Sequence, residues 1–295
     1  MITKELIKDV TLTILKRAET TLPEAVKVAL KRAYEREEGE IARAQLEAML
    51  KNVELAEELQ RPLCQDTGLP LFFVRLGGGG DCNVKLGDIE AGIRAGVAEA
   101  TEAIPLRANV VDPILRTGSG GNIGDKIPYI TYTVEPEVDG IEICVFPKGG
   151  GSENMAAFTM LMPKQGAEAV KAIRNFVLEM VLKAAGKPCP PTIIGVGVGG
   201  SADVAMKLAK MALLRPVGER HKEVRLAEVE EAILEAVNNT GIGPMGLGGK
   251  TTALDVHIET ASTHITSLPV AVNFQCWAAR QAAAKIAPDG RVEYL

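Results

Sequence analysis

Three of the five cysteines of this chain lie in segments whose composition is typical of a reactive centre. Cys64 stands in RPLCQDTGLP, Cys189 in GKPCPPTIIGVGVGG and Cys276 in VAVNFQCWAAR. Thiolates are the usual ligands of iron–sulfur clusters, and a cubane cluster normally takes four of them. Three cysteines would therefore hold a cluster with one iron open to water or substrate, just as an open position distinguishes a catalytic zinc site from a structural one. Such a cluster would act as a Lewis acid and transfer no electron.

Two further residue types near these segments could take part in chemistry. Asp66 lies two residues after Cys64, which would pair a metal ligand with a proton carrier, although a buried thiol before an Asp-Thr-Gly turn explains the same spacing. Arg107, in PLRANVVDP, could bind a carboxylate through two N–H groups, and a surface arginine remains the simpler interpretation. Cys82 and Cys144 have no such neighbours, and the alternating pattern around Cys144 indicates a small core residue.

Two glycine-rich segments suggest a different class of protein. Gly195–Gly200 matches GxGxxG between an apolar run and a helical pattern, which is the context of a dinucleotide-binding loop. The motif lies far into the chain without a clear preceding βαβ half, so a helix N-terminus that binds some anion fits better. GPMGLGGKT has Pro244 where a Walker A loop needs its first glycine, which excludes that motif, but Lys250 could still offer a cation to a carboxylate.

Composition narrows the class of protein. The 295 residues are 46% apolar and 24% charged, enough for a large core, and the net charge of −5 argues against a nucleic-acid surface. No run approaches the roughly 18 apolar residues of a membrane span, and the N-terminus does not form a signal peptide, so a cytoplasmic protein is expected. The odd number of widely spaced cysteines favours reduced thiols over a disulfide framework.

The order of the expected elements indicates a mixed α/β fold, with a helical N-terminal segment packed on a core of mixed sheets and helices. We expect the helical segment to cover residues 1–60 and the core to cover 61–295, as one integrated domain. Residues of about 3–60 are predicted to be helical, with a first pattern through Leu6–Ile14, a second that opens at Pro23 and Glu24 and runs through Leu30, and a third at about 40–59. Further helices are predicted at 167–183, 201–214 (with Ser201 as N-cap) and 225–239. Strands are predicted at 69–77, 128–136, 140–147, 192–198 and 269–274, and around Val256 and Val292.

Six blocks in one order resemble the class I iron–sulfur hydro-lyases, which include fumarate hydratase and L(+)-tartrate dehydratase. They are CQDTG, LRANVVDP, KGGGSEN, CPPTIIGVGVGGSAD, GIGPMGLGGKT and FQCWAAR, and they span about residues 60–280. The resemblance implies a 4Fe-4S cluster on Cys64, Cys189 and Cys276, with Asp66 as the catalytic acid. It further implies that the substrate dicarboxylate is bound by Gln65, Arg107 and His264 and by backbone N–H groups around Gly150.

The resemblance also implies a partner. Single-chain members continue into a second region that no part of this sequence matches, so the chain looks like the α subunit of a two-chain enzyme, with a β subunit in an α2β2 assembly. Hydration of fumarate to L-malate is the first expectation, and dehydration of L(+)-tartrate to oxaloacetate is the alternative within the family. Two hypotheses of other classes remain: a nucleotide-binding protein that uses Gly195–Gly200, and a scaffold for the β chain in which the cysteines are dispensable.

Overall fold

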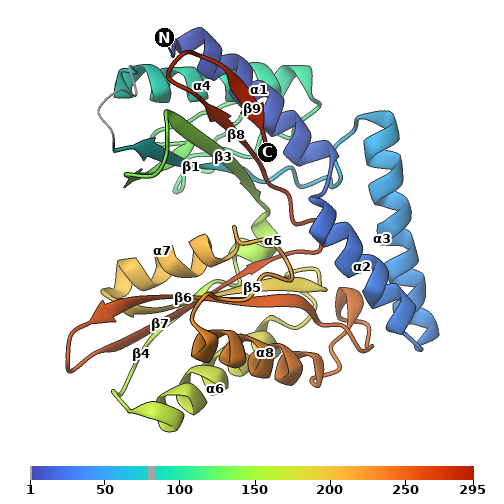
Figure 1. The fold of residues 1–295 in the computed structure, drawn as a ribbon. Coiled ribbons are helices and arrows are strands. Elements are labelled where there is room, and N and C mark those ends of the chain that lie inside the picture. The colour runs from blue at the N-terminus through green and yellow to red at the C-terminus, as the bar shows by residue number, and fades with distance from the viewer. Residues whose placement is uncertain (1, 79–83) are drawn as a thin grey trace. The chain divides into compact units, whose positions relative to one another are not determined.

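The computed structural model describes residues 2–78 and 84–295 and divides into two compact units. Unit 1 consists of Met1–Pro23, Asn52–Gly149 and Arg280–Leu295, and unit 2 consists of Glu24–Lys51 and Gly150–Ala279. Each unit contains its own mixed sheet with helices packed on it (Figure 1). The expected mixed α/β class is therefore confirmed, while the single boundary near residue 60 stays a prediction.

The three N-terminal helices form where helical spacing predicts them. They are α1 (Lys4–Thr20), α2 (Glu24–Arg36) and α3 (Glu40–Leu59). The α1 helix begins after Thr3, whose Oγ1 accepts the Leu6 N–H at 3.2 Å and satisfies one of the unpaired donors of the first turn. Its apolar face is fully buried, so α1 contributes to the core of unit 1.

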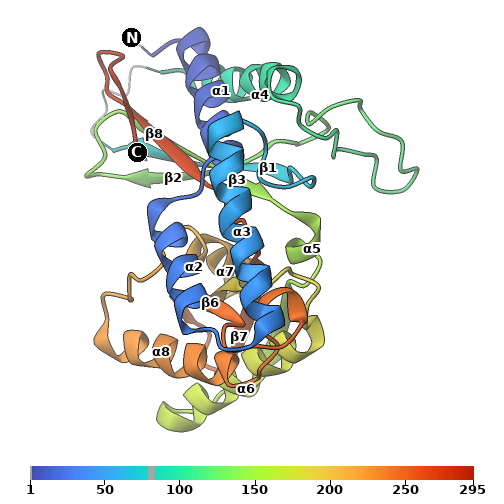
Figure 2. The same ribbon diagram turned by 90° about the vertical axis from the view of Figure 1, so that its right-hand side faces the viewer.

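Unit 1 is built on a five-stranded sheet in the order β2-β1-β3-β8-β9. The strands are β1 (Leu69–Gly77), β2 (Tyr129–Glu135), β3 (Ile141–Lys148), β8 (Ala282–Ile286) and β9 (Val292–Tyr294). Only β1 and β2 run parallel. Helices α1 and α4 (Leu86–Ala103) lie side by side against the sheet (Figures 1 and 2), and together they enclose the core. The sequence reading predicted β1, β2, β3 and β9 but not α4 or β8.

Unit 2 is built on a four-stranded sheet in the order β4-β7-β5-β6. Its strands are β4 (Ala157–Leu161), β5 (Thr192–Gly200), β6 (Ala253–Thr263) and β7 (Leu268–Gln275). Helix α7 (Ala202–Ala212) covers one face, and α6 (Gly166–Ala184) and α8 (Val224–Asn238) cover the other (Figure 1). The unit also contains α2, the first part of α3, the short helix α5 (Gly150–Glu153) and a 3-10 turn at Pro244–Gly246. No helix of the described residues is long and apolar enough to cross a membrane.

The GxGxxG segment owes its glycines to packing inside unit 2. A Cβ built on Gly195 would meet the Ala209 carbonyl oxygen at 2.0 Å, and one on Gly197 would meet the Ala205 carbonyl oxygen at 2.0 Å. The glycines therefore let α7 lie directly on β5. Ser201 occupies the N-cap position as predicted, but its hydroxyl bonds the Asp203 carboxylate instead of a backbone N–H, which corrects the expected capping bond.

Replacement of Gly197 by alanine will therefore destabilise the fold. We expect Gly197→Ala to lower the free energy of unfolding by about 3 kcal/mol, because the new methyl group forces α7 away from β5. Gly87→Ala, in α4, is the control, since no atom lies within 4 Å of the added Cβ. Chemical denaturation of both variants checks this. A Gly197→Ala protein of unchanged stability that loses dinucleotide binding would instead favour the nucleotide-binding hypothesis.

Candidate active site

The loop that carries Cys64, here called the Cys64 loop (Leu63–Gly68), connects α3 to β1 in unit 1. At its start, the Leu63 N–H donates to the Glu19 carbonyl oxygen at 2.8 Å, and the Asn52 side chain donates to the Leu63 carbonyl oxygen at 2.9 Å. At its end, Asp66 Oδ1 accepts the Gly68 N–H at 2.9 Å. This last bond forms an Asx-turn, which is the structural role that the sequence offered for Asp66. The same turn also fixes the position of the Asp66 carboxylate.

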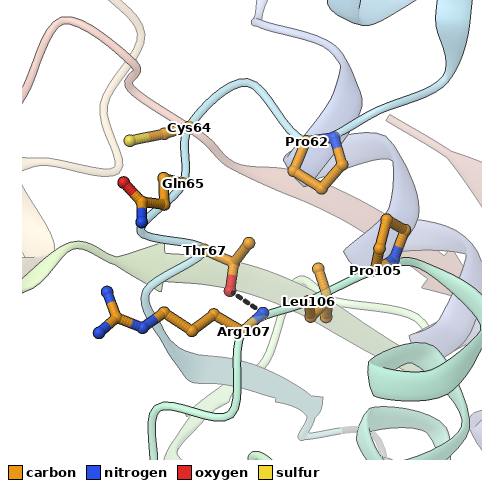
Figure 3. Close-up of a pocket in the computed structure, with 7 residues that line it drawn as sticks. All are labelled: Pro62, Cys64, Gln65, Thr67, Pro105, Leu106 and Arg107. Carbon is orange, nitrogen blue, oxygen red and sulfur yellow. Dashed lines mark hydrogen bonds between the residues drawn. The ribbon is translucent and has the colours of Figure 1, made fainter.

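A pocket of about 550 Å³ opens beside this loop. Figure 3 shows the Cys64 thiol, the Gln65 amide and the Arg107 guanidinium extending toward the same side of the pocket. The remaining lining residues are Pro62, Thr67, Pro105 and Leu106. The fold thus brings together three of the predicted site residues of unit 1, although Arg107 is distant from the other two in sequence. The lining contains one cation and no carboxylate, which suits a small anion.

Hydrogen bonds hold the main chain of Arg107 on both sides. Its N–H donates to Thr67 Oγ1 at 3.1 Å, and its carbonyl oxygen accepts from the Asn122 side chain at 3.1 Å. Asn109 donates to the Gly68 carbonyl oxygen at 2.9 Å and so ties the same segment to the Cys64 loop. Sequence reasoning missed these supporting residues, because isolated Thr and Asn side chains in loops follow no periodic pattern. Their effect is to fix the main chain at Arg107 relative to the loop that bears Cys64 and Asp66.

The other two predicted ligands lie together in unit 2. The Trp277 N–H, next to Cys276, donates to the Cys189 carbonyl oxygen at 3.2 Å. This contact arises because β5 and β7 are antiparallel, with Ile193 opposite Gln275, so the start of one strand lies beside the end of the other. Cys189 has a φ of 55°, a left-handed conformation that is costly for a residue with a side chain and is concentrated at functional sites.

The KGGGS segment approaches the same end of unit 2. A Cβ on Gly151 would come within 3.1 Å of the Lys187 carbonyl oxygen, two residues before Cys189. The backbone around Gly150 therefore lies close to the chain that presents the second cysteine. Glu153, at the end of α5, accepts from Lys210 at 2.5 Å and from the buried Asn273 at 3.4 Å, which fixes the short helix against α7 and β7.

His264 lies elsewhere in unit 2. It follows β6, is exposed to solvent, and has its Nδ1 at 2.9 Å from Thr266 Oγ1. The eight residues of β7 separate it from Cys276, and at about 3.4 Å per residue they place the two roughly 25 Å apart. His264 and Cys276 of one chain therefore lie at opposite ends of β7.

Cys144 and His257 lie within strands of the two sheets. Cys144 lies in β3, where burial raises the pKa of its thiol to about 12, as expected for a core residue. Cys82 lies outside the described residues. His257 is fully buried and has its Nε2 at 3.1 Å from the Asp255 carboxylate. The ammonium group of Lys250 pairs with a carboxylate of this chain, that of Glu38, at 2.6 Å. The Lys250 backbone N–H donates to the Glu37 carboxylate at 2.8 Å.

The chemistry of the thiols fits an iron–sulfur cluster. Cys64, Cys189 and Cys276 are each half-buried, and none of the four described cysteines forms a disulfide. Cys64 belongs to unit 1 and the other two belong to unit 2. Among residues 2–78 and 84–295, no group of three histidine, cysteine or acidic side chains that could hold a metal is found.

Unit 1 thus places a half-buried thiol, a carboxylate held in a turn and a cation on adjoining loops, an arrangement suited to a small anion. The family model of fumarate hydratase (Fumerase) matches residues 8–285, and the chain belongs to this family. Membership makes it a hydro-lyase chain and implies an iron–sulfur cofactor. It also confirms the family resemblance deduced from the ordered sequence blocks.

Curated relatives extend this similarity over nearly the whole chain. A protein of Methanocaldococcus jannaschii, described as a proposed L(+)-tartrate dehydratase subunit alpha, is 48% identical over 97% of this chain and 99% of its own length. The L(+)-tartrate dehydratase subunit alpha of Escherichia coli K12 is 36% identical over 94% of this chain and 89% of its own length. The Shigella boydii protein of the same name shows the same identity and coverage.

Proposed function

We propose that this chain is the α subunit of an iron–sulfur hydro-lyase that interconverts fumarate and L-malate. The observation that carries the proposal is the pocket beside the Cys64 loop, because it joins a candidate ligand, an amide and a cation around a space for a small anion. Membership in the fumarate hydratase family supports the reaction type. An enzyme of this kind would work in the cytoplasm, where thiols stay reduced.

The cofactor of this proposal is a 4Fe-4S cluster held by Cys64, Cys189 and Cys276. When bound, it supplies a Lewis acid that polarises the hydroxyl and carboxylate of the substrate. The half-buried thiols and the left-handed backbone at Cys189 support this ligand set. The Trp277–Cys189 hydrogen bond would keep two of the three ligand segments in register.

The residues of the Cys64 loop supply the remaining chemistry. Elimination of water must expel a poor leaving group, and in this proposal the Asp66 carboxyl gives its proton to the departing hydroxyl oxygen. The Asx-turn to Gly68 supports that role because it leaves little freedom for the carboxylate. Gln65 and the N–H groups around Gly150 would orient the substrate, and Arg107 would bind one of its carboxylates.

Replacement of Arg107 should weaken substrate binding more than it slows the chemical step. We expect Arg107→Met to raise KM by about 10- to 100-fold, because a charge-assisted hydrogen bond to a carboxylate is lost. The hydrogen bonds that its main chain donates to Thr67 and accepts from Asn122 will persist. Arg116→Met, in the same segment but outside the pocket lining, should leave KM unchanged. Steady-state kinetics of both variants test this prediction. A KM of Arg107→Met equal to that of the wild type would contradict the role of Arg107 in substrate binding.

The partner in this proposal is a β subunit in an α2β2 assembly. The curated relatives are named as alpha subunits, which implies a second chain for them. That chain would supply the base that takes the C3 proton and further cations for the dicarboxylate. His264 would also contact substrate, and its distance from Cys276 along β7 means that it would serve the site of another copy in the assembly.

L(+)-tartrate is the second candidate substrate, since the curated relatives carry the name of tartrate dehydratase. Tartrate differs from malate by one hydroxyl group, so the choice depends on how that group is hydrogen-bonded. Turnover of malate and of L-tartrate by the reconstituted two-chain complex, compared as kcat/KM, will distinguish them. A preference for malate supports the proposal, and a preference for tartrate replaces it with the second candidate.

The cluster itself is tested separately from the substrate. We expect anaerobic reconstitution to load iron and acid-labile sulfide, and the spectrum of the loaded protein to change when malate is added. Saturable dinucleotide binding without iron uptake would instead support the nucleotide-binding hypothesis. Activity that survives serine at all three proposed ligands would support the scaffold hypothesis.

A further inference from the structure

A buried ion pair lies behind the Cys64 loop in unit 1. Arg280 Nη1 donates to Glu19 Oε2 at 2.8 Å, and both side chains are only 1% exposed. Arg280 is among the largest fully buried side chains of the described residues. Replacing such a pair by apolar residues is often neutral or stabilising, because both charges lose their hydration. Stability alone is therefore a weak explanation for this pair.

The acidic member of the pair contacts the Cys64 loop. Glu19 is in the last turn of α1, and its carbonyl oxygen accepts the Leu63 N–H at 2.8 Å. Burial raises the pKa of Glu19 to about 7 against the opposing effect of Arg280, and the negative charge of Asp66 adds to the increase. Glu19 Oε1 is buried without a hydrogen-bond partner in the described part of the chain.

The basic member connects the loop to the sheet. Arg280 stands two residues before β8 and four residues after Cys276. The end of α1 supports the Cys64 loop. The bond between Arg280 and Glu19 therefore connects this end of α1 to the segment that leads into β8 of the unit 1 sheet. A displaced Arg280 would release α1 from that segment and loosen the support of Leu63.

We propose that Glu19, held by Arg280, is a positioning residue that fixes the Cys64 loop and thereby the carboxylate of Asp66. Neither member lines the pocket, so the pair acts on the reaction through Asp66 and does not touch substrate. The effect on catalysis rests on the function proposed above, whereas the effect on the loop does not.

Two variants and two measurements test the inference. Glu19→Gln keeps the shape of the side chain and removes its charge, and Glu19→Met/Arg280→Met replaces the pair by apolar groups that are compatible with burial. In the full chain without cluster, we expect hydrogen exchange of the Leu63–Gly68 amides to become about 10-fold faster. In the reconstituted complex, we expect kcat to fall about 10- to 100-fold with KM and iron content nearly unchanged, as for residues that orient a site from behind.

Glu142→Gln is the matched control. Glu142 pairs with Arg75 between β3 and β1 of the same unit, away from the Cys64 loop, so its loss should leave exchange of those amides unchanged. Exchange and kcat that match wild type in the double methionine variant would overturn the inference, because the pair would then only stabilise the fold. Faster loop exchange, with no hydro-lyase activity even in the wild-type complex, would support the positioning of the loop and overturn the proposed function.

Discussion

Cys64→Ser will abolish cluster loading and reduce hydro-lyase activity by at least about 100-fold, since ligand replacements remove the metal centre itself. Serine has nearly the shape of cysteine, so the Cys64 loop should keep its bonds to Glu19 and Asn52. Its hydroxyl, however, is a much weaker ligand for iron than a thiolate. The measurements are iron and acid-labile sulfide per complex after anaerobic reconstitution, together with turnover of malate.

Cys144→Ala provides the control for this variant. Cys144 lies in β3 between β1 and β8, and the raised pKa of its thiol keeps it protonated and unsuited to bind metal. Alanine at this position should therefore leave iron content and turnover unchanged. Equal iron loading of Cys64→Ser and wild type would show that Cys64 is not a ligand and would remove the main support for an open-iron site.

The second large effect is expected for Asp66→Asn, which should lower kcat by about 10²- to 10⁴-fold, the range for loss of a general acid. Asparagine can still accept the Gly68 N–H through its side-chain oxygen, so the Asx-turn and the shape of the loop persist. Iron content and KM should therefore stay close to wild type. Single-turnover kinetics of the loaded complex will show whether the chemical step is the one that slows.

Asp112→Asn is the control for Asp66→Asn. The Asp112 carboxylate also accepts backbone N–H groups in a turn, from Ile114 at 2.9 Å and Leu115 at 2.6 Å, but it lies outside the Cys64 loop. Its replacement should leave kcat unchanged. If both asparagine variants retain full activity, the proton must come from another group, and Asp66 would have only the structural role that its turn explains.

Much of the local structure was predictable from the sequence. The three N-terminal helices, most strands of both sheets and the position of Cys144 within a strand follow from short-range patterns, because helical and alternating spacing report which face of an element is buried. The α4 helix was missed, and β8 was missed because AAAKI has neither alternation nor β-branched residues before its last position. The glycines of the GxGxxG segment have a packing role that its sequence pattern did not reveal, since they allow α7 to lie directly on β5.

The candidate site was likewise predictable only in part from the sequence. The sequence by itself determined the family, because ordered blocks around Cys64, Cys189 and Cys276 depend on residue types and spacing alone. Only the tertiary structure decided that Arg107 shares a pocket with the Cys64 loop and that His264 and Cys276 lie at opposite ends of one strand. It also decided that Glu19, which accepts the Leu63 N–H, forms a buried pair with Arg280. These relations depend on strand pairing and loop hydrogen bonds between residues far apart in the chain, and no local pattern encodes such contacts.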